Sequence, residues 1–303
     1  GNVFLATNMW DNASAISNEG IEFEAQYDVI RKKNWNWSVG FNLSHNKNML
    51  RKTYNGEDLN DKVLGRPVYG IYTFKDEGIV QKEEDIPMYL NASGKQIPLY
   101  FQSINNPLRV GGRKIKDQNY DGVIDDKDLY YAGSTLPAVY GGLNSHLEWK
   151  GLSFDVLFSY TISRKVMNMY KNSAFTFTKD FGVIMNYFHA GDFWTTSNRD
   201  AKYPSLEFAD KDYVGQFDGN VDSNIENISF LRLKQLVIGY QIPKNWLKGS
   251  FIKDANVYLS GENLFLLTNY SGVDPEIINP YSGKDDGTQY PLNRKVTLGL
   301  NLK

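Results

Sequence analysis

The chain has 303 residues, with 33 Lys and Arg against 35 Asp and Glu, and a formal net charge of −2. This near-neutral balance leaves no electrostatic footprint for a nucleic acid, and three His without any Cys argue against a zinc site. The 20 Tyr, 17 Phe and 26 Gly favour long β-strands separated by turns, and no apolar run approaches the length of a transmembrane helix, about 18 residues.

Seven segments alternate apolar and polar residues as β-strands do. In the clearest, apolar side chains occupy the even positions from Leu152 to Ile162, while Ser153, Asp155 and Ser159 occupy odd positions. Because successive side chains of a strand point to opposite faces, each segment would present one apolar and one polar face. The predicted strands, in chain order, are 19–30, 35–46, 140–149, 152–163, 229–242, 255–267 and 292–302.

The lengths of these strands and of their connections indicate a membrane barrel. Soluble sandwiches use strands of about 5–6 residues and bury the apolar face against a second sheet. Here the strands are about twice that length, and short turns alternate with long segments at about 48–138, 164–227 and 268–290. Outer-membrane barrels alternate short periplasmic turns with long extracellular loops. We therefore predict an all-β, transmembrane antiparallel β-barrel with these three long loops outside the cell.

Aromatic residues gather near the short turns and predict an interfacial girdle. They are Tyr27, Trp35, Trp37, Trp149, Phe154, Tyr240 and Trp246.

Seven strands do not close a bacterial barrel, because single-chain barrels have even strand numbers. An open sheet edge in lipid would leave unpaired backbone groups, each costing several kcal/mol. We expect residues 1–303 to be the C-terminal part of a larger barrel, roughly its last seven strands, with the remaining strands upstream.

One loop segment has the pattern of a calcium-binding loop. Residues 117–128 place oxygen ligands at positions 1, 3, 5 and 9, a Gly at position 6 and a backbone carbonyl at position 7. Position 12 holds an Asp where the pattern prefers Glu, and no helix is evident before the loop. The pattern predicts a structural Ca²⁺ site in an extracellular loop; the alternative is a turn held by its own side-chain to backbone bonds. The predicted ligands are Asp117, Asn119, Asp121, the Val123 carbonyl, Asp125 and Asp128.

The second long segment combines carboxylates with aromatic residues. Such pairs suggest a glycosidase or a sugar-stacking surface, and the alternative is a solvated acidic loop. No motif elsewhere sets a nucleophile beside a base, and His45, His146 and His189 are scattered, with His146 predicted to face the barrel interior. We expect no catalytic residues. The residues of the second segment concerned are Asp192, Phe193, Trp194, Asp200, Tyr203, Glu207, Asp210, Asp212, Tyr213 and Asp218.

Four segments resemble the SusC/RagA-type TonB-dependent transporters of Bacteroidetes outer membranes. They are FLRLKQLVIGYQIP at 230–243, NVYLSGENLF and its continuation at 256–276, the stretch 117–142 and NEGIE at 18–22. Their order and spacing also fit the family, and together they touch most of the chain.

This resemblance implies an active importer. The family folds as a plugged barrel of about 22 strands. It works with a SusD-like surface lipoprotein, and TonB pulls on the upstream plug to open a path. The function implied is TonB-dependent import of a large nutrient, an oligosaccharide or a peptide, across the outer membrane of a Gram-negative, Bacteroidetes-like cell. The expected partners are therefore the lipoprotein, TonB, the upstream barrel and plug, and membrane lipid.

The alternative is a secreted all-β module that binds or degrades glycans. The apolar face decides between the two, because lipid requires Phe154, Val156, Phe158, Tyr160 and Ile162 to remain uncovered by protein, whereas a soluble module buries them.

Overall fold

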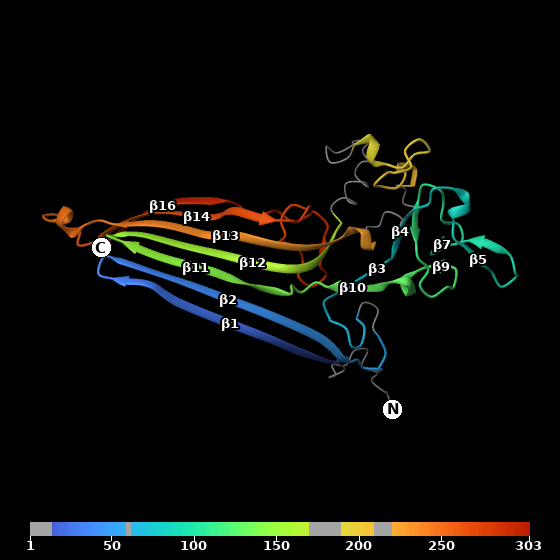
Figure 1. The fold of residues 1–303 in the computed structure, drawn as a ribbon, viewed down its shortest axis with the longest axis horizontal. Coiled ribbons are helices and arrows are strands. Elements are labelled where there is room, and N and C mark those ends of the chain that lie inside the picture. The colour runs from blue at the N-terminus through green and yellow to red at the C-terminus, as the bar shows by residue number, and fades with distance from the viewer. Residues whose placement is uncertain (1–13, 59–61, 170–188, 209–219) are drawn as a thin grey trace, which may run out of the picture.

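The structure is a computed structural model, and it describes residues 14–58, 62–169, 189–208 and 220–303. One antiparallel sheet of long strands dominates it (Figure 1). All seven predicted strands are confirmed, and each one after the first pairs with the long strand that precedes it in the chain. In spatial order they are β1 (Ala15–Lys32), β2 (Trp35–Lys52), β11 (Val139–Trp149), β12 (Leu152–Asn168), β13 (Ile225–Gln241), β14 (Ala255–Thr268) and β16 (Lys295–Leu302).

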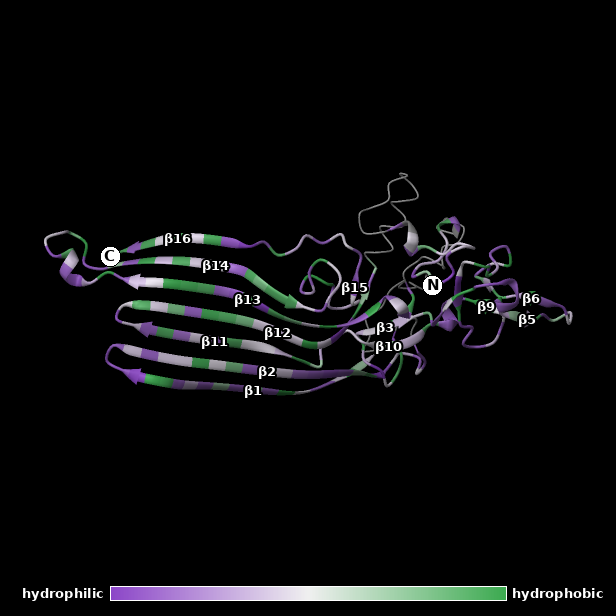
Figure 2. Cartoon of the chain, turned by 45° about the horizontal axis from the view of Figure 1, so that its top comes forward, coloured by the Kyte–Doolittle hydropathy of each residue, from purple (hydrophilic) through white to green (hydrophobic). Residues whose placement is uncertain are grey.

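The strand register collects the apolar side chains on one face. One row of paired residues runs across five strands from Phe41 through Leu143, Phe158 and Leu233 to Phe265. Figure 2 shows the resulting alternation of hydrophobic and hydrophilic residues along each strand. Among the described residues, no second sheet packs across the apolar face. The all-β antiparallel sheet with one apolar face is therefore confirmed.

The apolar belt is shorter than the strands. Outward positions of β2 are apolar from Trp35 to Leu43, and the next two outward positions are His45 and Lys47. A membrane strand needs about 9–11 residues, whereas β2 has 18. The sequence prediction ended this strand at 46, because the apolar alternation stops there. The strand itself continues to Lys52, since β1 pairs with it to the end.

The opposite end of the sheet has tight turns. Lys150 and Gly151 have φ angles of 48° and 89°, as a two-residue hairpin of the type I′ family requires. At this end of the sheet, Trp35 of β2 pairs with Trp149 of β11, and their ring centroids are 6.1 Å apart. Both are exposed, as is Trp246 in the third short connection, so the structure places aromatic groups where the girdle was predicted.

The long segment between β2 and β11 folds around a core of its own. The sequence pattern gives no sign of this core. Phe74, Phe101, Ile115 and Ile124 are buried together, with Val221 from the next long segment. These contacts join residues far apart in sequence, and no local periodicity reveals them.

Short elements frame this core, and together they form what we call the loop module (residues 62–138, 189–208 and 220–224). Its strands are β3 (Gly70–Thr73), β4 (Asp76–Ile79), β5 (Met88–Leu90), β6 (Gln96–Pro98), β7 (Tyr100–Phe101), β8 (Arg113–Ile115), β9 (Val123–Ile124) and β10 (Tyr130–Ser134). Its 3₁₀ turns are η1 (Glu83–Asp85), η2 (Asp126–Asp128), η3 (Ala190–Asp192), η4 (Leu206–Phe208) and η6 (Asp222–Asn224).

Residues 269–294, which we call the strap, leave β14 and fold back against the end of the sheet. Within the strap, β15 (Lys284–Asp285) pairs in parallel with Met167 and Asn168 of β12. Tyr270 and Ile278 of the strap are buried with Val166 and Ile228. The turn η7 (Lys244–Leu247) lies in the short connection at the other end. In the described part of the chain, no helix is long and apolar enough to cross a membrane.

Candidate functional site

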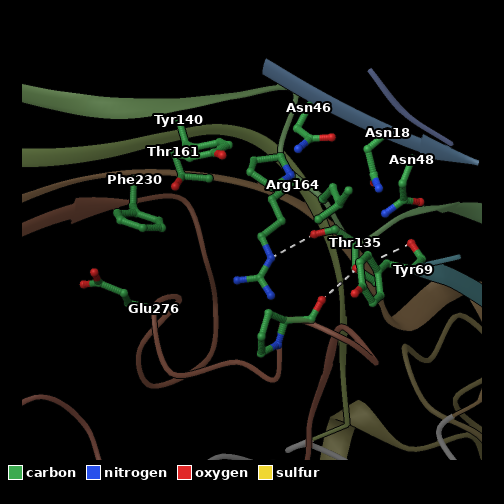
Figure 3. A pocket seen from close by; sticks show the side chains of 13 residues that line it. Asn18, Asn46, Asn48, Tyr69, Thr135, Tyr140, Thr161, Arg164, Phe230 and Glu276 are labelled. Carbon is green, nitrogen blue, oxygen red and sulfur yellow. Dashed lines mark hydrogen bonds between the residues drawn. The ribbon is translucent and has the colours of Figure 1, made fainter. Parts of the chain in front are cut away.

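A cavity of about 390 Å³ opens on the polar face, where the strands meet the loop module and the strap (Figure 3). Five strands and both of these regions contribute to its wall. The lining residues are Asn18, Asn46, Asn48, Tyr69, Thr135, Leu136, Pro137, Tyr140, Thr161, Arg164, Phe230, Glu276 and Pro280.

Three amide side chains form one wall of the cavity. Asn18 of β1 pairs in register with Asn48 of β2, and Asn46 lies two residues further along the same face. Asn48 is buried, and its Oδ1 accepts a hydrogen bond of 2.8 Å from the Val68 backbone. Because amides donate and accept, this wall suits polar ligands such as peptides or sugars.

A β-bulge directs Arg164 into the cavity. The pairing of β12 with β13 shifts between Thr161 and Arg164, and Ser163 has a φ angle of 54°. The Ser163 N–H donates to Ser229 Oγ at 3.1 Å. Since a bulge inserts one extra residue, Thr161 and Arg164 share the polar face. Unbroken alternation would have put Arg164 on the apolar face with Ile162.

Backbone carbonyls hold the guanidinium of Arg164. Its Nε donates to the Thr135 carbonyl at 3.0 Å. Its Nη2 donates to the carbonyls of Ile278 and Asn279, each at 3.3 Å, and Nη1 donates to that of Pro275 at 3.4 Å. The side chain therefore joins β12 to the strap and to the segment before β11. Figure 3 shows it reaching between Glu276 and Thr135.

A buried ion-pair network fixes the start of the strap. The Arg232 guanidinium of β13 pairs with Asp274, and the two side chains are 3 % and 4 % exposed. Arg232 Nε lies 2.6 Å from Glu276 Oε2, and Lys234 also pairs with Glu276. Asp274 accepts hydrogen bonds from the backbone N–H groups of Glu276 and Leu292 at 3.0 and 3.2 Å. These contacts place the Glu276 carboxylate at the rim of the cavity.

A second polar network, centred on Asp222, joins the two long segments of the loop module. Asp222 accepts hydrogen bonds from Lys75 Nζ at 2.6 Å, Tyr130 Oη at 2.7 Å and the Asp76 backbone at 2.9 Å. Burial alone would raise the pKa of Asp222, but these three donors outweigh burial and lower it. Asp76 in turn pairs with Arg113. The two long segments of the module are thus held together near the cavity.

The predicted calcium loop is closed by its own side chains. Asp117 accepts from the N–H groups of Tyr120 at 2.6 Å and Gly122 at 2.8 Å. Asp128 accepts from those of Gln118 at 2.7 Å and Asp125 at 2.9 Å. These are the contacts of the alternative interpretation, an Asp-rich turn.

The remaining predicted ligands follow the same pattern. Asn119, Asp121 and Asp125 each accept a bond from the backbone two residues later, and Val123 lies in β9. Burial raises the pKa of Asp128, whereas the hydrogen bond from the Val123 N–H lowers that of Asp121. Within the described ranges, no three His, Asp or Glu side chains are grouped to hold a metal ion. Calcium binding here stays a prediction.

The aromatic residues of the second long segment are not an open surface. Phe193, Trp194 and Tyr203 are buried, and Trp194 Nε1 donates to Gln81 of the first segment at 2.9 Å. These three side chains are therefore not exposed for sugar stacking: Phe193 and Tyr203 contact each other, with ring centroids 5.9 Å apart, and Trp194 contacts the first segment. Asp192 accepts from the His189 backbone, whereas Asp200 and Glu207 are exposed. Asp210, Asp212, Tyr213 and Asp218 lie outside the described residues.

The structure does not bring the three histidines together. His146 lies on the polar face, as predicted, with Nδ1 2.5 Å from Asp155 Oδ1. His45 Nδ1 lies 2.6 Å from the Ala138 carbonyl, and His189 is exposed at the start of the second part of the loop module. They form no common site.

Sequence reasoning missed the role of Arg164, Arg232 and Glu276. The last two lie inside segments that carry the family resemblance, but alternation assigns no partner to them. A charged residue at an apolar position was the available signal for Arg164, and only the bulge explains it.

Known proteins that resemble the chain are receptors and transporters. The chain is 30 % identical over 304 residues to the TonB-dependent receptor P26 of Formosa agariphila, covering 96 % of the chain and 29 % of that receptor. It is 26 % identical over 299 residues to the TonB-dependent receptor SusC of Bacteroides thetaiotaomicron, covering 97 % and 27 %. No family model matches the chain.

A solved structure resembles the fold as well. The RagAB peptide transporter superposes with a TM-score of 0.66 at 22 % identity, covering 96 % of the chain and 30 % of that protein. The chain thus spans less than a third of the length of these relatives. With the motifs, strand order and apolar face described above, these similarities show that the chain belongs to the SusC/RagA-type TonB-dependent transporters, as a segment of their β-barrel.

Proposed function

We propose that this chain is part of a transporter that imports a large nutrient across the outer membrane. The observation that carries the proposal is the sheet itself, whose apolar face is uncovered while its polar face bears the cavity. Among the described residues, β1 and β16 each pair with a single long strand. Their free edges need partners in lipid, and the remaining strands of a closed barrel would supply them.

The orientation follows from the connections. Short turns join the strands at one end, whereas the loop module and the strap lie at the other. We infer that the loop module faces the outside of a Gram-negative, Bacteroidetes-like cell, since long barrel loops do so. The cavity would then lie in the outer part of the barrel interior, where arriving cargo first meets the wall.

Energy and partners would come from outside this chain. TonB would act on an upstream plug, and a SusD-like lipoprotein would deliver cargo to the loop module. Support comes from the relatives, which are named TonB-dependent receptors, and from the solved RagAB peptide transporter. The cargo class is an oligosaccharide or a peptide, and import requires no covalent step, so we propose no enzymatic activity.

A secreted glycan module explains the structure less well. It would bury the apolar face, but Phe265, Leu298 and Ile162 remain 48, 75 and 49 % exposed. A water-facing sheet with such a surface would aggregate.

The test is peptide-mapping mass spectrometry of the native complex, purified in detergent from the outer-membrane fraction. We expect upstream plug and barrel peptides together with a surface lipoprotein. Recovery of residues 1–303 alone from the soluble fraction would contradict the proposal and favour the secreted module.

A further inference from the structure

The starting observation is a buried cation without an acidic partner. Arg164 is 8 % exposed, and its four hydrogen bonds all go to backbone carbonyls. Among the described residues it forms no ion pair, and a guanidinium has five N–H donors, so one Nη1 N–H keeps no acceptor. Burying a charge is costly unless an opposite charge compensates it.

The surrounding charges do not compensate Arg164. The two nearby carboxylates of the strap, Asp274 and Glu276, pair with Arg232 and Lys234. Both carboxylates are thus engaged by other cations, and Glu276, which lines the cavity beside Arg164, forms its ion pairs with Arg232 and Lys234. Apart from Arg164 and Glu276, the residues that line the cavity are uncharged. A cavity with this balance favours a ligand that carries one negative charge and accepts further hydrogen bonds.

We propose that the cavity receives a carboxylate of the imported cargo, with the Arg164 guanidinium as its main partner and the Asn46 amide as a further polar group of the same cavity. This inference rests on the proposed import function and adds the chemical class of the group recognised. Peptides and acidic oligosaccharides both carry carboxylates, so the two sources share this chemistry. Phe230 and the prolines of the cavity would contact the apolar part of either ligand.

The experiment is calorimetric titration of the complete transporter complex in detergent with two matched probe pairs. One pair is an N-acetylated hexaglycine with a free C-terminal carboxylate and its C-terminal amide. The other is trigalacturonate and its methyl ester. For at least one pair, we expect the acid to bind about tenfold more tightly than its neutral counterpart. The pair that shows this preference identifies the source.

Two isosteric variants locate the preference. Asn46→Asp places a competing carboxylate in the cavity and is expected to abolish the preference for the acid. Asn256→Asp makes the same change at the far end of the polar face and is expected to preserve it. Arg164→Gln is a third variant, but its bonds to the strap affect folding, so the Asn46→Asp result decides.

Equal affinity for both members of each pair overturns the proposal, as does the absence of binding by all four probes. A preference that survives Asn46→Asp also overturns it, because the recognising cation would lie elsewhere. These results leave the import function standing if the complex co-purifies from the outer membrane. Failure of co-purification would contradict the import function itself, independently of the titrations.

Discussion

If the even positions of β12 face lipid, a single charged side chain at the middle of the membrane should strongly destabilise the barrel. Val156 is the third of the six outward positions of β12 between Leu152 and Ile162, and it pairs with Ser145 and Leu236. An Arg at the membrane midplane costs a barrel about 2–4 kcal/mol. We expect Val156→Arg to lower the free energy of unfolding by that amount. The folding equilibrium would shift by about 30- to 700-fold, since about 1.4 kcal/mol corresponds to a factor of ten.

The first assay is equilibrium unfolding of the complete transporter in lipid vesicles. The second measures how much of each variant is present in the outer membrane of the cell. Leu157→Arg is the matched control, because Leu157 is the adjacent residue on the polar face and is half-exposed. Ile162→Arg tests depth, and near the border of the belt its cost is about 0–1 kcal/mol. Equal penalties for Val156→Arg and Leu157→Arg would refute the assignment of faces.

Three further predictions concern the regions outside the belt. Arg232→Gln leaves the Asp274 carboxylate buried without its partner, at a cost of about 3–5 kcal/mol, and limited proteolysis should then cut the strap. Lys295→Gln removes an exposed pair and should leave the strap resistant; cleavage of both variants alike would contradict the role of the Arg232–Asp274 ion pair in holding the strap. Asp222 has a lowered pKa, so its carboxylate stabilises the loop module above the ordinary Asp pKa, and that stability is lost as pH falls through the lowered value. Proteolysis against pH should therefore show acid loosening that Asp222→Asn removes, and an unchanged acid profile in this variant would contradict the role of Asp222. Ca²⁺ is expected to protect the 117–128 loop from proteolysis, and identical cleavage with calcium and with chelator would leave the self-bonded turn as the explanation.

The strands and their faces could be predicted because a period of two is a strong signal over ten or more residues. The apolar positions of β12 and β16 are enough to assign the face of the sheet that contacts lipid. The same signal misjudged the ends of the strands. Beyond Leu43 the outward residues of β2 turn polar although the strand continues, because backbone pairing with β1 does not depend on side-chain polarity.

The cavity could not be predicted from alternation. Its central residue, Arg164, reaches the polar face only because Ser163 forms a bulge. Glu276 reaches the rim only because Arg232 and Lys234 hold it, across more than 40 residues of sequence. Likewise, Val221 completes the core of the loop module from a separate segment. Such contacts depend on how distant segments fold together, and no local pattern encodes them.

In a barrel wall, the even positions of β12 contact lipid and the odd positions face the interior. Because the chain has no Cys, single cysteines can replace each residue from Leu152 to Ile162 in the complete transporter in native outer membranes. Labelling with a membrane-impermeant maleimide should alternate with period two, with odd positions labelled and even positions protected. Uniform labelling, or labelling of the even positions, would contradict a lipid-embedded barrel wall.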